Sequence, residues 1–133
     1  MSVVQILPIF AAVGVVLITF AVAMQPLNAK WRGAWVFPAC MSVLFLAWSL
    51  FAVLTEGPLG FWAEHTRNRW GNQILFDLLL AAGIAWSVIV PRAKAQSMNV
   101  YLWLVFILCT GSIGLLATLS RLMLLEERAA AKA

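Results

Sequence analysis

The chain has 133 residues, of which 64% are hydrophobic and only 11% charged, and its mean hydropathy is +0.96. A soluble domain is about half apolar and about a quarter charged, so this composition excludes a soluble globular protein. It also excludes an intrinsically disordered chain, because such chains are poor in apolar residues and rich in charge. The net charge of +4 comes from cations at the ends of apolar stretches. This placement indicates contact with lipid headgroups and not with nucleic acid.

Four apolar stretches are each long enough to cross the hydrocarbon core of a bilayer, which takes about 20 residues per helix. Inside lipid each segment must satisfy its own backbone hydrogen bonds, and helices of this length do so. We therefore predict an all-α integral membrane four-helix bundle that forms a single transmembrane domain over residues 1–133. The predicted spans are residues 3–24, 34–55, 71–90 and 99–120.

The first stretch also has a feature of a secretory signal peptide, because Ala21-Val22-Ala23 resembles a small-residue cleavage site. However, the residues before it carry no basic side chain, and the apolar run is longer than the core of a signal peptide. We therefore interpret residues 3–24 as a membrane span. The third stretch is expected to stop at Pro91, since proline disrupts the helix interior.

The connection over residues 56–70 is the longest loop of the predicted topology. It begins with the helix breakers Gly57, Pro58 and Gly60 and continues as a polar run flanked by aromatic side chains. Aromatic residues around a polar run are typical of a segment at the headgroup level. We expect an interfacial connector here, and a substrate lid is the alternative.

Asp77 is the one acid inside a predicted span. It costs roughly 3 kcal/mol to insert, so we expect it to turn inward and find a partner. If the third and fourth helices are antiparallel, Asp77 comes near the level of Arg121. We predict an Asp77–Arg121 ion pair, which either fixes the rotation of the two helices or handles a proton or ligand. The polar residues expected around it are Asn68, Asn72, Gln73, Ser120 and Gln5.

Small residues form a stripe on each of the same two helices. Thr110, Gly114 and Ala117 recur at helical spacing in the fourth stretch, and Ala81 and Ala85 follow Asp77 in the third. Small side chains let two membrane helices approach closely. We therefore predict that these stripes face each other.

The chain offers no evident ligand set for a metal or for haem. His65 is the single histidine, and Cys40 and Cys109 lie within predicted spans, where we interpret them as small buried hydrophobes. No nucleotide-binding or nucleophile motif is present. Trp48 and Trp86 lie deeper than the other tryptophans, where they are expected to pack or to contact a lipid or pigment.

The second half of the chain carries a pattern of motifs. It comprises the segment Asn68–Leu79, then Trp86, Pro91–Lys94, Thr110–Leu116 and Arg121. Over about residues 68–122 it resembles a family of small bacterial inner-membrane proteins classified as a domain of unknown function. The acid-Ala-Arg loop usual in that family appears here as Pro91-Arg92-Ala93. The resemblance implies a polytopic membrane protein and gives no catalytic residue.

Orientation is not decided by charge alone. With four spans, the face with both termini carries five cations and the other face four, so the positive-inside rule gives a tie. The resemblance implies that the loop over residues 91–98 is cytoplasmic. Both termini are then expected on the periplasmic side of the inner membrane.

These features favour a non-catalytic polytopic membrane protein that serves as an accessory or packing subunit of a larger complex. The expected partners are membrane lipid and either other membrane subunits or a second copy of the chain. One alternative is a small proton-coupled transporter that uses Asp77. In size it is similar to the small multidrug exporters, but those carry their essential acid in the first helix, and residues 3–24 are uncharged here. The other alternative is a membrane enzyme acting on a lipid or isoprenoid, with Asp77 as its acid.

Overall fold

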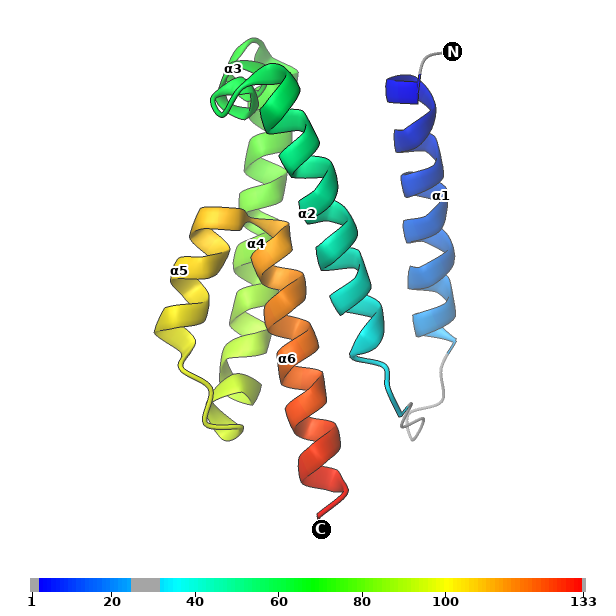
Figure 1. The fold of residues 1–133 in the computed structure, drawn as a ribbon, viewed down its shortest axis with the longest axis vertical. Helices are drawn as coiled ribbons and strands as arrows, with labels where there is room; N and C mark the ends of the chain where they lie inside the picture. Colours follow the sequence, from blue (N-terminus) through cyan, green and yellow to red (C-terminus); the bar gives the residue numbers. More distant parts are fainter. Residues whose placement is uncertain (1–2, 25–31, 133) are drawn as a thin grey trace. The chain divides into compact units, whose positions relative to one another are not determined.

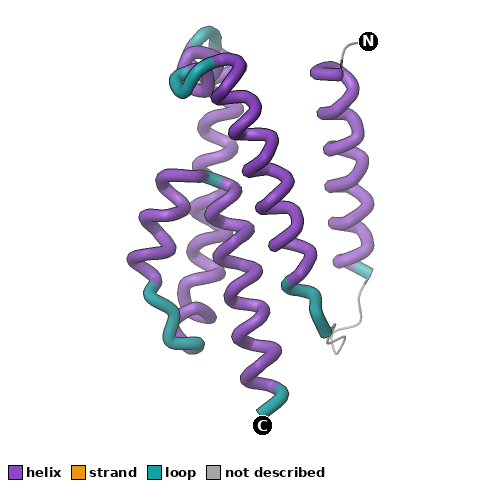
Figure 2. The backbone as a smooth tube through the Cα atoms, in the orientation of Figure 1, coloured by secondary structure: helices purple, strands orange, loops and turns teal. Residues whose placement is uncertain are grey.

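A computed structural model describes residues 3–24 and 32–132, with side chains from residue 5 onward, and the described part is helical without strands. From α2 to α6, successive helices are connected by short turns (Figures 1 and 2). In chain order they are α1 (Val3–Ala23), α2 (Val36–Glu56), α3 (Gly60–Thr66), α4 (Arg69–Ala95), α5 (Val100–Thr110) and α6 (Ser112–Ala130).

The chain divides into two compact units, residues 1–31 and residues 32–133. The first unit contains α1, and none of the described side chains of this helix is buried. The second unit contains the other five helices. A single transmembrane domain over the whole chain stays a prediction.

Three helices in the described residues are long and apolar enough to cross a membrane. They correspond to the first three predicted spans, so the helical character of those spans is confirmed. Their bounds within the described side chains are Gln5–Ala23, Val36–Glu56 and Arg69–Ala95.

The fourth predicted span, residues 99–120, is not confirmed as one helix. The chain reverses at Gly111, where φ is +60°, a backbone conformation that glycine adopts without the steric cost of a Cβ. The α5 helix before this turn has only eleven residues, which corresponds to about 16 Å. The α5 and α6 helices therefore form a hairpin, and α6 runs in the same direction as α4 (Figure 1). A four-helix bundle is not confirmed for this reason.

The prediction that the third span stops at Pro91 is wrong, because α4 contains Pro91 and continues to Ala95. Packing explains the extra turn. Ile89 and Ala93, before and after the proline, are both buried against Leu122 of α6. This contact holds the last turn of α4 despite the hydrogen bond that the proline cannot make.

The register between α2 and α6 is set by two serine hydroxyls. Ser42 Oγ donates a hydrogen bond to the carbonyl of Ile113 at 2.9 Å, and Ser120 Oγ donates to the carbonyl of Trp35 at 2.9 Å. From Trp35 to Ser42 the residue number rises by seven, while that of the bonded residue in α6 falls from Ser120 to Ile113, so the two helices are antiparallel. Hydrogen bonds of this kind join helices in an apolar setting, where the hydrophobic effect between helices is absent.

The short helix α3 packs against the first turn of α4. Gly71 makes this contact close, since a Cβ at this position would lie 2.6 Å from the carbonyl oxygen of Glu64. Asn68 caps α4 by accepting a hydrogen bond from the N–H of Gly71 at 2.8 Å. The polar start of α4 is thereby fixed at the end of the unit that holds α3.

Candidate functional site

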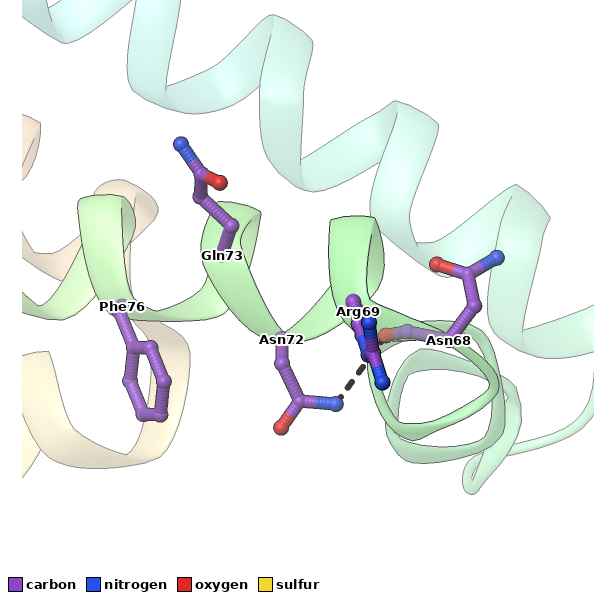
Figure 3. A pocket seen from close by; sticks show the side chains of 5 residues that line it. All are labelled: Asn68, Arg69, Asn72, Gln73 and Phe76. Atoms are coloured by element: carbon purple, nitrogen blue, oxygen red, sulfur yellow. Dashed lines mark hydrogen bonds between the residues drawn. The ribbon is translucent and has the colours of Figure 1, made fainter.

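Part of the predicted polar cluster does gather at the start of α4. Asn68, Asn72 and Gln73 line an open pocket of about 630 Å³ together with Arg69 and Phe76 (Figure 3). The side-chain amide of Asn72 donates a hydrogen bond to the carbonyl of Asn68 at 3.2 Å. These residues are brought together by consecutive turns of one helix.

The polar groups of this pocket do not converge on one point. Figure 3 shows Gln73 on one side of α4, whereas Asn72 and Phe76 extend on the other side. The side-chain amides of Asn72 and Gln73 therefore do not face one another across the pocket.

Asp77 lies one turn beyond Gln73 on α4 and is exposed. The hydrogen bonds and ion pairs of the described residues do not include its carboxyl group. It is therefore an acid on an apolar, span-length helix with no partner in the described part of the chain.

The predicted Asp77–Arg121 ion pair is wrong, because its premise of an antiparallel third and fourth helix fails. The α4 and α6 helices run in the same direction (Figure 1), with Arg92 of α4 opposite Glu126 of α6. Counting back along each helix from that pair at 1.5 Å per residue, Asp77 and Arg121 differ in level by about 15 Å.

Arg121 and Ser120 are also separated from Asp77. Arg121 is exposed, and Ser120 is buried with its hydroxyl bonded to the carbonyl of Trp35. Gln5 belongs to α1, in the unit of residues 1–31. Within the unit of residues 32–133, the cluster expected from the sequence is thus divided between the start of α4 and the middle of α6.

The predicted small-residue stripe does not lie on one helix, since Gly111 separates Thr110 from Gly114 and Ala117. Gly114 is indeed a close-packing position, but it faces α5. A Cβ there would lie 2.9 Å from the Cα of Ile107 and 2.6 Å from the hydroxyl of Thr110. On α4, Ala81 is exposed and Ala85 is half-buried.

The ion pair that the structure contains in this region joins Arg92 and Glu126. Arg92 Nε and Nη2 donate to the two carboxylate oxygens of Glu126 at 2.9 and 2.6 Å, a bidentate geometry. The neighbouring Glu127 accepts a hydrogen bond from the N–H of Gly33 at 3.0 Å. Neither contact was predicted from the sequence, although the acidic pair after the last apolar run was an available signal for both.

We expect Glu126→Gln to lower the free energy of unfolding by about 0.5–1 kcal/mol, because both partners are partly exposed and solvent weakens the pair. Glu64→Gln is the matched control. Its contact with Arg67 is 3.5 Å long and more exposed, so no measurable change is expected. Reversible unfolding in mixed detergent micelles, followed by tryptophan fluorescence, gives both values. Equal losses in the two variants would contradict the prediction.

The described residues contain no group of three or more His, Cys, Asp or Glu side chains that could bind a metal ion. The expectation that Cys40 and Cys109 are buried is wrong, since both thiols are free and exposed on apolar helices. His65 Nδ1 lies 2.8 Å from the carbonyl of Phe61 one turn earlier, and its ring lies against the ring of Phe61.

Comparison of this chain with protein-family models, with curated proteins and with solved structures gives no match. The resemblance to the bacterial inner-membrane family accordingly stays a prediction.

Proposed function

We propose that this chain is a polytopic membrane protein of the bacterial inner membrane that serves as a non-catalytic accessory or packing subunit. The proposal is supported by the apolar surface of the span-length helices. Large hydrophobic side chains are exposed on α2 between Val36 and Leu54 and on α4 between Trp70 and Val88, where lipid or another membrane protein would cover them. Among the most exposed are Val43, Leu44, Leu54, Leu79, Leu80 and Ile84.

The observation that carries the proposal is the position of Asp77. An acid within a membrane-spanning helix costs roughly 3 kcal/mol unless it is paired or solvated. Asp77 is exposed on α4 and has no partner in the described residues. A polar group from another chain would meet this requirement and would make the Asp77 face of α4 a contact within an assembly.

The mass of the purified chain in mild detergent tests this proposal. We expect the wild type to have the mass of an assembly in light scattering, and Asp77→Leu to weaken that assembly about five- to thirtyfold in dissociation constant. This range corresponds to the loss of one polar contact between membrane helices. Glu64→Leu, which removes a carboxylate from α3 instead, is the matched control and should leave the assembly intact. A wild-type chain that is monodisperse and alone would contradict the proposal.

A second candidate function is proton-coupled transport, which the same unpaired carboxyl group favours. In a transporter Asp77 would bind and release a proton within the membrane. We expect Asp77→Asn, reconstituted in vesicles with an imposed pH gradient, to abolish substrate-dependent proton flux if transport is the function. Unchanged flux in that variant would exclude this candidate, whereas the mass measurement addresses assembly independently.

A further inference from the structure

Three segments that are distant in the sequence meet at one end of the unit formed by residues 32–133. The N–H of Gly33, just before α2, bonds to Glu127 near the end of α6. Arg92, near the end of α4, binds Glu126 of the same turn of α6. In Figure 1 this is the end at which α6 terminates, opposite α3. We call it the α6 end.

The hairpin of α5 and α6 explains why the end of the chain returns to this position. A crossing of the hydrocarbon core requires about 30 Å, and the eleven residues of α5 reach about half of that. The chain then reverses at Gly111 and returns through α6. In a bilayer spanned by α2 and α4, such a hairpin enters and leaves at the same surface. Non-helical backbone at its turn is tolerated where it is buried in protein or lines a cavity containing water.

The cationic residues of this unit are concentrated at the α6 end. Five described cations lie there, all of them exposed, against two carboxylates, Glu126 and Glu127. At the opposite end the two cations Arg67 and Arg69 are balanced by Glu56 and Glu64. Only Arg92 of the five forms an ion pair within the described residues. The five are Arg32, Arg92, Lys94, Arg128 and Lys132.

We propose that the α6 end binds the anionic phospholipid headgroups of one leaflet, with the α4–α5 turn and the end of α6 on the same side of the membrane. The proposal rests on the membrane placement proposed above. Cations near the ends of spans are retained on the cytoplasmic side, where the leaflet is anionic. With a hairpin instead of a fourth crossing, the cations of α6 lie on the same side as the α4–α5 turn, so the cations are no longer divided almost equally between the two faces. The end of α6 is then cytoplasmic, in place of the periplasmic position expected from four spans.

Cysteine accessibility tests the sidedness. In a background with Cys40→Ala and Cys109→Ala, single cysteines are introduced by Gln96→Cys, Ala131→Cys and Glu64→Cys. A membrane-impermeant maleimide is applied to sealed vesicles of known orientation, before and after permeabilisation. We expect Gln96→Cys and Ala131→Cys to be labelled from the same side, and Glu64→Cys from the other. Labelling of Ala131→Cys from the same side as Glu64→Cys would show a fourth crossing and overturn the proposal.

Lipid retention tests the headgroup contact. The full chain is reconstituted in nanodiscs with equal phosphatidylglycerol and phosphatidylcholine, and the lipid retained after detergent extraction is measured by mass spectrometry. We expect the double variant Lys94→Gln/Arg128→Gln to lower the preference for phosphatidylglycerol about fivefold or more, since each cation near a headgroup surface contributes about fivefold. The matched double variant Arg67→Gln/Arg69→Gln should leave it unchanged. An equal loss in both variants, or no loss in either, would overturn the proposal.

Failure of the membrane placement itself would be distinguishable from these outcomes. A chain that alkaline carbonate removes from membranes does not span them, and the proposed function then fails with the inference. A chain that resists carbonate but shows a fourth crossing or no headgroup preference contradicts only the inference.

Discussion

Leu122→Ala is expected to lower the free energy of unfolding of the unit formed by residues 32–133 by about 2–4 kcal/mol. Leu122 is fully buried and contacts Ile89 and Ala93 of α4, so truncation leaves a cavity where two helices meet. The loss should appear as a shift in the unfolding transition in mixed micelles, with tryptophan fluorescence as the readout.

The matched control for this variant is Leu108→Ala. Leu108 lies on α5 with 76% of its surface exposed, so the same truncation removes little packing. A change below about 0.5 kcal/mol is expected there. If both leucine variants lost the same stability, the core between α4 and α6 would not be formed as described.

Gly114→Ala is expected to destabilise the α5–α6 hairpin by about 1–3 kcal/mol, because the added methyl group overpacks the contact. The methyl group would lie 2.9 Å from both the Cα of Ile107 and the carbonyl oxygen of Phe106, and backbone atoms cannot move away cheaply. Unfolding in mixed micelles gives the loss, and amide hydrogen exchange of α5 shows whether it is confined to the hairpin.

This variant also discriminates between the hairpin and a continuous fourth span. In one straight helix over residues 99–120 Gly114 would face no reversed α5, and alanine would raise helix propensity by up to about 1 kcal/mol. Gly83→Ala on α4 is the control, since a Cβ there meets nothing within 4 Å. A gain in stability for both glycine variants would contradict the hairpin.

The sequence was sufficient for those parts of the fold that depend on composition alone. The apolar runs that became α1, α2 and α4 are long and nearly free of charge, so hydropathy locates them to within a few residues. The interruption at Gly111 was not predictable in the same way. A glycine within an apolar run is compatible with a continuous membrane helix, and only the close contact of Gly114 with α5 reveals the reversal.

The candidate site was predictable only within one helix. Asn68, Asn72 and Gln73 are close in sequence, so their common location on α4 follows from helical spacing. Which residue of a neighbouring helix pairs with a charged residue depends on whether the two helices are parallel or antiparallel, and on where each residue lies along the helix axis. Reading α4 and the following segment as two antiparallel spans paired Asp77 with Arg121, whereas the hairpin reverses α6 and brings Glu126 to Arg92.

The α5–α6 hairpin extends along α4 only as far as the level of Asp77. Counted from the Arg92–Glu126 pair, Ser112 at the start of α6 lies within about one residue's rise of Asp77 on α4. Within the unit formed by residues 32–133, the α5–α6 hairpin therefore ends close to the level of Asp77, and α2 and α4 continue past that level towards α3 (Figure 1). If α4 spans a membrane as proposed, the acyl chain or neighbouring helix that lies beside α4 beyond the hairpin sets the polarity that the Asp77 carboxyl group experiences.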